Sequence, residues 1–209
     1  MRKLLSTDID GTLLFNAAIS QDDLAAMTRW RDAGNLLVPN TGRSVAALHS
    51  ALSGSDLAFD YSVLYTGAAL TDGGYDVLEA RTLPDGLAEE ILDLLEGEAG
   101  VTVFATTLEG DLQLYDSIGS DTALLTLFSR ASRADLAGRT VVGVPLRIAD
   151  PALMAHMQAE VARRWGDVAV GFHNQNFLDI VPAGSSKGAG LTVLVERLAA
   201  DDGPCRGER

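Results

Sequence analysis

The sequence is short of cysteine and of long apolar runs, and both shortages exclude classes of protein. Its single cysteine, Cys205, cannot form an internal disulfide, which fits a reducing compartment. The longest apolar stretches have the length of strands, far below the roughly 20 residues that span a bilayer. No basic and apolar leader follows Met1, so we expect a soluble cytoplasmic protein without a membrane partner.

Basic residues are also scarce. The chain has 16 Lys and Arg against 29 Asp and Glu, and its net charge of −13 is spread along the sequence. Because nucleic-acid-binding proteins normally cluster Lys and Arg on one face, we expect no nucleic-acid partner. With 209 residues, 47% of them hydrophobic, the chain can bury a sizeable core without disulfides or a structural metal.

Short apolar runs alternate with helical patterns in the first third of the chain. This region predicts, in order, a strand at 3–7, a helix from the cap at Ser20 to Gly34, a strand at 36–39, a helix at 43–52 and a strand at 61–65. That order is typical of a right-handed, doubly wound α/β unit with a parallel sheet. A hairpin turn at Asp72-Gly73-Gly74 then leads away from this unit.

The rest of the chain has a different order of elements. It predicts a helix after Pro84, strands at 101–105 and 112–115, a helix at 124–134, a strand at 141–148, a helix at 151–165, paired strands at 168–172 and 177–181, and a last helix with its apolar stripe at 191–198. We therefore expect a core domain of residues 1–79 and 182–209, with an α+β domain of residues 80–181 inserted into it.

The candidate chemistry begins directly after the first strand, where Asp8-Ile9-Asp10-Gly11-Thr12 forms a polar turn. Open parallel sheets bind their ligands at the carboxyl ends of strands, so the position favours function. Two aspartates two residues apart bring two negative charges together, which requires a cation or a shared proton. The alternative is an Asp-rich turn without a ligand.

Two further segments are predicted to face the same cleft. Thr41-Gly42-Arg43 follows the second strand and opens a helix, and helix N-termini bind phosphate. Lys187 begins the last helix, where a fixed ammonium can offset the charge between a phosphoryl group and an aspartate. Taken alone, each segment has an alternative interpretation. The tripeptide can be a helix cap with a solvated Arg43, and Lys187 can be an exposed surface lysine.

Together these three segments resemble the motifs of the haloacid dehalogenase superfamily, whose phosphatases use an aspartate nucleophile. The phrases Leu64–Ala68 and Asp179–Pro182, and the place of the inserted domain, resemble its Cof-type, sucrose-phosphatase-like subclass IIB. The resemblance extends to about Leu198, and Thr66 stands where the family has Asn. It implies a doubly wound, parallel-sheet α/β core covered by an α+β cap.

The resemblance also implies an activity, the hydrolysis of a small phosphorylated metabolite such as a sugar phosphate. Asp8 would attack phosphorus to form an aspartyl-phosphate, while Asp10 protonates the leaving oxygen and later activates water. Mg²⁺ would be held by the Asp8 carboxylate and the Asp10 carbonyl. The remaining implied site residues, which would bind phosphate or substrate, are Thr41, Gly42, Arg43, Lys187 and, on a cap turn, Asn174.

The family's fourth motif, a Gly-Asp loop after a further strand, has no counterpart in the 22 residues after Lys187, whose tail Asp201–Arg209 lacks an apolar strand. We therefore expect a truncated or frame-shifted chain that leaves its first strand at an open sheet edge, where a second copy can pair. The alternative to an active enzyme is a catalytically impaired relic that still binds phosphate. The three histidines are too scattered to predict a metal site.

Overall fold

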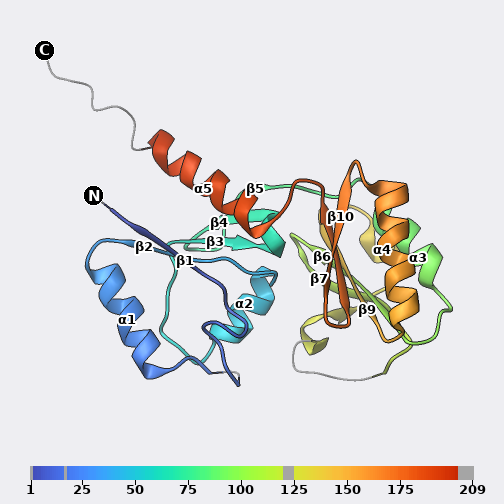
Figure 1. The fold of residues 1–209 in the computed structure, drawn as a ribbon, viewed down its shortest axis with the longest axis horizontal. Coiled ribbons are helices and arrows are strands. Elements are labelled where there is room, and N and C mark those ends of the chain that lie inside the picture. The colour runs from blue at the N-terminus through green and yellow to red at the C-terminus, as the bar shows by residue number, and fades with distance from the viewer. Residues whose placement is uncertain (1, 17, 120–124, 202–209) are drawn as a thin grey trace, which may run out of the picture.

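The chain folds into two α/β units that lie side by side, as the ribbon of this computed structural model shows (Figure 1). The structure describes residues 2–16, 18–119 and 125–201. We call the part that carries both ends of the described chain the core unit, and the part built around residues 87–182 the six-stranded unit. The tail from Asp202, with Cys205, lies outside the described residues, as does the side chain of Asp201.

The sheet of the core unit is parallel at one side and antiparallel at the other. Its strands are β1 (Leu4–Thr7), β2 (Leu36–Pro39), β3 (Tyr61–Leu64), β4 (Ala69–Asp72) and β5 (Val77–Ala80). β1 and β2 pair in parallel, and a parallel bridge between Asn40 and Val63 continues the sheet to β3. β3, β4 and β5 are antiparallel, with the predicted hairpin turn between the last two.

Helices cover both faces of this sheet. α1 (Gln21–Asp32) and α2 (Val45–Leu52) pack on the face that carries Leu37 and Leu64, whereas α5 (Lys187–Asp201) packs on the face of Val38 and Val63. Successive strand residues point to opposite faces, so an uninterrupted apolar strand needs cover on both sides. This arrangement confirms the doubly wound core expected from the sequence.

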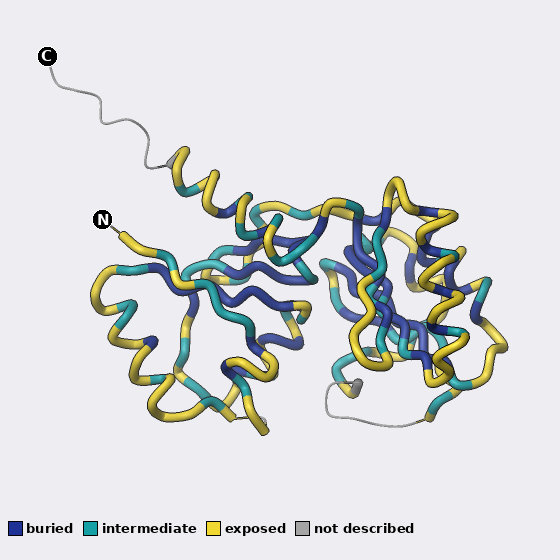
Figure 2. Tube along the Cα trace, viewed as in Figure 1, coloured by how far each residue is buried: buried dark blue, intermediate teal, exposed yellow. Residues whose placement is uncertain are grey.

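The six-stranded unit is a single sheet with two helices on one face. Its strand order is β10-β11-β9-β6-β7-β8, antiparallel except for the β7–β8 pair. Figure 2 shows buried residues concentrated along the middle of the sheet, where it meets the helices. Its elements are α3 (Leu87–Leu95), β6 (Val101–Thr107), β7 (Gly110–Asp116), β8 (Ser129–Arg130), β9 (Val141–Ile148), α4 (Pro151–Trp165), β10 (Ala169–Asn174) and β11 (Phe177–Pro182).

The helix predicted at 124–134 is wrong over its described part. The chain forms a 3₁₀ turn at Leu125–Leu127, the short strand β8, and a second 3₁₀ turn at Arg133–Leu136, while residue 124 lies outside the described residues. β8 adds to the edge of β7, and Ser132 starts the second turn as a capping box with Asp135. Pairing with the sheet edge and a new N-cap therefore outcompete the apolar helical pattern.

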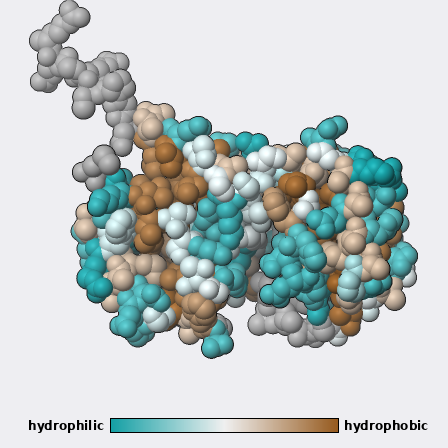
Figure 3. Space-filling model, viewed as in Figure 1, coloured by the Kyte–Doolittle hydropathy of each residue, from teal (hydrophilic) through white to brown (hydrophobic). Residues whose placement is uncertain are grey.

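One edge of the core sheet is open, since β1 pairs with β2 alone among the described strands. Leu5 on this edge strand is exposed, and Val195 on the neighbouring α5 is exposed as well. Figure 3 shows apolar side chains gathered on this side of the core unit, between α5 and the N-terminus. Among the described helices, none is long and apolar enough to cross a membrane.

Candidate active site

The structure brings Asp8 and Lys187 together although they lie at opposite ends of the chain. Asp8 follows β1, and its Oδ1 accepts hydrogen bonds from the Ile9 N–H at 2.8 Å and from Lys187 Nζ at 2.7 Å. The side chains are 38% and 42% exposed, so a ligand can reach both. Because Oδ2 is left without a partner in the described part of the chain, it is available to a ligand.

Lys187 is placed by the first turn of α5. Ser186 accepts a hydrogen bond from the Ala189 N–H at 3.0 Å, in the manner of an N-cap, and so fixes where the helix begins. The Lys187 carbonyl accepts a hydrogen bond from Asn40 Nδ2 at 2.9 Å, which ties this turn to the end of β2. The start of α5 is thus fixed beside the carboxyl ends of the first two strands.

Asp10 is occupied by Arg43 in a two-pronged ion pair. Arg43 Nε donates to Oδ2 at 2.9 Å and Nη2 donates to Oδ1 at 2.7 Å, while Nη1 donates to the Ala47 carbonyl at 3.0 Å. A planar guanidinium matches a carboxylate in this way and fixes its orientation. The structure therefore places Arg43 on Asp10, whereas the family resemblance directs it toward a substrate or the cap.

The loop after β2 differs in detail from the prediction that Arg43 opens the helix. α2 begins at Val45, and its N-cap is Ser44, whose Oγ accepts from the Ala47 N–H at 3.1 Å. Thr41 is only 1% exposed, and its Oγ1 accepts from the Arg43 N–H at 3.2 Å, so this hydroxyl supports the turn before the helix. Gly42 is exposed and presents the loop backbone to solvent.

The turn at Tyr65–Gly67, within the phrase that resembles the family, joins these loops, and its left-handed conformation was not predicted from the sequence. Three successive residues are left-handed, with φ of 50° at Tyr65, 56° at Thr66 and 86° at Gly67. The Thr66 N–H donates to the Thr41 carbonyl at 3.2 Å, and a Cβ on Gly67 would stand 1.9 Å from the Ser186 carbonyl oxygen. Strained turns of this kind often hold functional loops, and Gly67 is the residue type in this turn that favours a positive φ.

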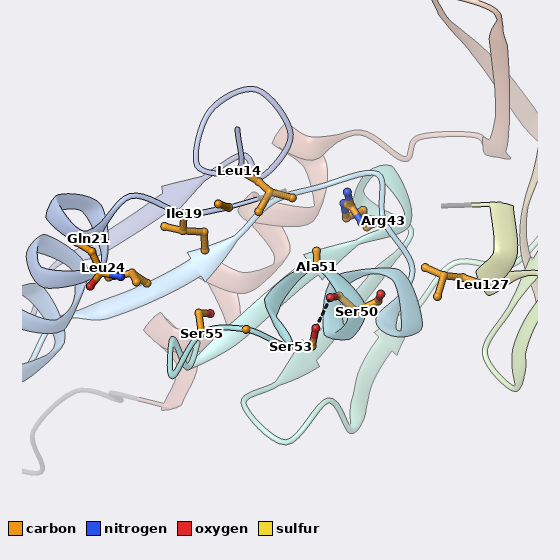
Figure 4. Close-up of a pocket in the computed structure, with 12 residues that line it drawn as sticks. Leu14, Ile19, Gln21, Leu24, Arg43, Ser50, Ala51, Ser53, Ser55 and Leu127 are labelled. Atoms are coloured by element: carbon orange, nitrogen blue, oxygen red, sulfur yellow. Dashed lines mark hydrogen bonds between the residues drawn. The ribbon is translucent and has the colours of Figure 1, made fainter. Parts of the chain in front are cut away.

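A cavity of about 560 Å³ opens beside the Arg43–Asp10 pair, between α2 and the segment that leads into α1 (Figure 4). Leu14, Ile19 and Ala51 give it apolar walls, and Ser50 gives a polar one. Its volume lies in the range of sites for small molecules. Arg43 thus lies between Asp10 and a space large enough for an organic group.

The remaining predicted site residue, Asn174, lies on the six-stranded unit, and two of the histidines have partners of their own. Asn174 is exposed at the end of β10 and makes no hydrogen bond with the acidic turn or Lys187 within the described residues. His49 stacks edge-on against Tyr75 with ring centroids 4.9 Å apart, and His173 bonds the Gln175 carbonyl at 2.7 Å. No group of three or more His, Cys, Asp or Glu that could hold a metal occurs in the described ranges.

Mg²⁺ needs fewer protein ligands than such a group supplies, because it keeps waters and takes phosphate oxygens from its substrate. The Asp8 Oδ2 atom and the Asp10 main-chain carbonyl are hard oxygen donors at one turn, so the residues present fit Mg²⁺ in type. Lys187 and Arg43 already balance the two carboxylates. A cation would therefore join a site whose charges are paired.

The fold and site define a class of protein. It has a doubly wound core with an acidic turn after its first strand, a lysine at the start of its last helix, and an α+β unit inserted between them. The family profile described as haloacid dehalogenase-like hydrolase matches residues 5–205. The chain belongs to this family, whose members are typically phosphatases and commonly depend on Mg²⁺.

Solved structures with the same fold cover most of the chain. A haloacid dehalogenase-like hydrolase from B. subtilis has a TM-score of 0.78 and 17% identity over 94% of this chain and 79% of its own. TM0651 from Thermotoga maritima has a TM-score of 0.77 and 21% identity, with 95% and 76% covered. The subclass IIB sugar phosphatase BT4131 has a TM-score of 0.76 and 18% identity, with 94% and 76% covered. Among curated proteins, none matches the sequence.

Proposed function

We propose that the chain is a cytoplasmic, Mg²⁺-dependent phosphatase that hydrolyses a small phosphorylated metabolite through an aspartyl-phosphate on Asp8. The observation that carries the proposal is the contact between Asp8 and Lys187. It presents a carboxylate at the end of β1 beside a fixed ammonium, with one carboxylate oxygen open. A nucleophilic carboxylate and a cation at the same point suit attack on phosphorus.

In the first step an Asp8 oxygen forms a bond to phosphorus as the bond to the leaving oxygen breaks. Lys187 offsets the negative charge shared by the carboxylate and the phosphoryl group, and the exposed Gly42 would allow a phosphate oxygen to approach the loop backbone. Water then attacks phosphorus and releases inorganic phosphate and free Asp8. Mg²⁺, held by the Asp8 carboxylate and the Asp10 carbonyl, would supply further charge for phosphate binding.

Asp10 carries the protons in this scheme. Once it is free of Arg43, Asp10 takes up a proton from solvent and gives it to the leaving oxygen in the first step; in the second step it takes a proton from the attacking water. Because Arg43 occupies both Asp10 oxygens, Asp10 can act only after the guanidinium swings aside. We propose that the substrate draws Arg43 toward the neighbouring cavity and so frees Asp10 during binding.

The size of the cavity and the presence of an inserted unit indicate which kind of substrate the chain would accept. BT4131, which shares the fold at 18% identity, is described as a sugar phosphatase. The cavity beside Arg43 is of a size to hold a sugar, and we propose a sugar phosphate as substrate. The domain of residues 80–181 would act as a cap that selects it, with Asn174 as a substrate contact, and exchange of this domain would change the esters cleaved.

The open edge of β1 is a place where a second copy of the chain could bind. A free strand edge with an exposed Leu5 can pair with another strand, and we propose a homodimer formed there by a second copy. Sedimentation of the chain across a range of concentrations tests this proposal. A monomer at all concentrations would contradict it.

The catalytic proposal is tested with an aryl phosphate assayed with and without Mg²⁺. The wild-type chain is expected to turn over only with Mg²⁺, and Asp8→Asn is expected to abolish turnover with an unchanged melting temperature. Asp32→Asn, at the exposed end of α1, is the matched control and keeps wild-type activity. Binding of inorganic phosphate without any turnover would instead support the impaired relic that still binds phosphate.

A further inference from the structure

A carboxylate of the six-stranded unit is buried against the core unit. Asp111, the second residue of β7, is 5% exposed and accepts a hydrogen bond from the hydroxyl of Ser44, which is 4% exposed. Ser44 is also the N-cap of α2, so the contact joins the inserted sheet to the first turn of a core helix. Asp111 Oδ1 is buried and lacks a hydrogen-bond partner among the described residues.

The surroundings of Asp111 are apolar and acidic. Val142 of β9 packs into the same hydrophobic cluster as Leu48 of α2, and Leu108 packs against it, so the two units meet here over apolar side chains. The Tyr65 hydroxyl accepts from the Val45 N–H at 3.4 Å. Burial, and then the negative charge of Asp111, raise the pKa of Tyr65 to about 12.

No cation compensates Asp111 within the described residues. Glu109, in the turn before β7, also raises the pKa of Tyr65 and adds a second negative charge on this side. On the α2 side, the Arg43 guanidinium is bound to Asp10 and His49 stacks on Tyr75. An ionised Asp111 therefore has one hydrogen bond from a neutral hydroxyl and no ion pair.

Protonation of Asp111 is thereby linked to contact between the units. Burial raises the pKa of Asp111 from 3.8 to about 6, although the Ser44 hydrogen bond lowers it. If the units separate, the carboxyl is exposed to water and its pKa returns to an ordinary value. Closure therefore takes up a proton between about pH 4 and pH 6. It is favoured at low pH and weakens as the pH rises through about 6.

We propose that Asp111 and Ser44 form a proton-controlled latch between the two units. With a proton on Asp111, the six-stranded unit is fastened to the N-terminus of α2. Without the proton, the buried charge favours separation of the six-stranded unit from the N-terminus of α2. Oδ1, which has no other partner, is the oxygen free to carry the proton while Oδ2 keeps the Ser44 hydrogen bond.

Hydrogen exchange tests the latch without any need for enzymatic activity. The measurement is the protection of backbone amides in segments 45–48 and 108–112 at pH 5.0 and 7.5, corrected for intrinsic exchange rates. In the wild-type chain, protection is expected to fall by about tenfold from pH 5.0 to 7.5, as two pKa values near 4 and 6 require. Asp111→Asn, which is neutral at both pH values, is expected to keep the higher protection throughout.

Asp116→Asn is the matched control, because Asp116 lies on the same strand but bonds Thr102 within its own unit. It is expected to follow the wild type. Ser44→Ala removes the hydrogen bond that lowers the pKa of Asp111, so the pH at which protection falls is expected to be higher. This variant tests the latch if Asp111→Asn does not fold. The latch is overturned if wild-type protection is equal at both pH values, if Asp111→Asn shows the wild-type pH dependence, or if Ser44→Ala leaves the transition in place.

Discussion

At the scale of single residues, the proposed mechanism depends on Lys187 more than on any other basic side chain. The chain has two lysines, Lys3 and Lys187, and the second lies 2.7 Å from Asp8. Both side chains of the pair are well exposed to solvent, so the ion pair adds little to stability. Its value is in holding a positive charge where phosphoryl transfer would develop negative charge.

Lys187→Ala is expected to lower kcat for an aryl phosphate by about 10² or more, with a melting temperature within a few degrees of wild type. Lys3→Ala, the other lysine, is the control, since Lys3 contacts Asn35 through its backbone N–H. Steady-state kinetics and thermal melting of both variants check this prediction. Wild-type kcat in Lys187→Ala would show that the ammonium has no part in the reaction.

The acidic turn and the two segments expected to bind phosphate could be located from the sequence because each follows a strand or opens a helix. The side-chain contacts that these segments make could not be predicted from the sequence. The ion pair of Arg43 with Asp10 and the hydrogen bond of Ser44 to Asp111 depend on side-chain rotamers and on how the two units pack. The periodic patterns of a sequence predict helices and strands, but they do not predict which distant side chains will contact each other.

At the scale of elements, the junction between the Tyr65–Gly67 turn and α5 fixes the site. Gly67 touches the Ser186 backbone, and a Cβ on Gly190 would stand 2.5 Å from Val63 Cγ1 and 3.0 Å from Gly67 Cα. Glycine at both positions allows α5 to approach β3 and the turn closely. This close approach places Lys187 at the end of β1.

Gly67→Ala is expected to destabilise the chain by about 2–4 kcal/mol, because it adds a steric clash to the cost of a left-handed alanine. Gly86→Ala is the matched control. Gly86 has the same φ of 86°, but a Cβ there would meet nothing within 4 Å, so only the conformational cost of about 1 kcal/mol remains. Urea unfolding measures both, and equal losses would show that α5 and the turn are not in close contact.

Elements with their own start signals were well predicted. The helix expected at 151–165 matches α4 residue for residue, because Asp150 is its N-cap and Pro151 occupies its first turn. The prediction of a helix at 124–134 was wrong because a segment that pairs with a sheet edge can have the same apolar pattern as a helix. Phe128, for example, stacks on Phe104 of β6 with ring centroids 4.4 Å apart.

At the scale of the whole molecule, carboxyls that are buried or half-buried in the fold make stability depend on pH. Burial raises the pKa of Asp179, on β11, to about 6. Its neighbours Leu178 and Ile180 point toward α3 and α4, so alternation along the strand places Asp179 on the opposite face of the sheet. An acid whose pKa is raised by folding stabilises the fold at low pH, and this contribution is lost as the pH rises through about 6.

Asp179→Asn is therefore expected to raise the free energy of unfolding at pH 7.5 by roughly 1–3 kcal/mol, with a smaller gain at pH 4.5. Urea unfolding at the two pH values measures the difference. Asp167→Asn, an exposed carboxyl of the same unit, serves as the control and is expected to change little at either pH. A larger gain at pH 4.5 than at pH 7.5 would contradict the raised pKa.

The fold class was predictable because strands and helices alternate along the first third of the chain. The strands there are apolar on both sides, as expected for a sheet that helices cover on both faces. The meeting of the two units was not, since it rests on a few buried contacts such as Val142 in the core cluster. The same holds for the strained Tyr65–Gly67 turn, where Tyr65 and Thr66 adopt positive φ that their residue types disfavour. Tertiary packing imposes that conformation.

The proposed reaction requires that Asp8 accept the phosphoryl group, and trapping the covalent intermediate tests this requirement. The chain is mixed with an aryl phosphate and Mg²⁺, quenched in acid within one turnover, digested and analysed by mass spectrometry. We expect a phosphorylated peptide with the modification on Asp8, present in the wild type and absent in Asp8→Asn. Hydrolysis without any phosphorylated Asp8, or phosphorylation of a different residue, would contradict it.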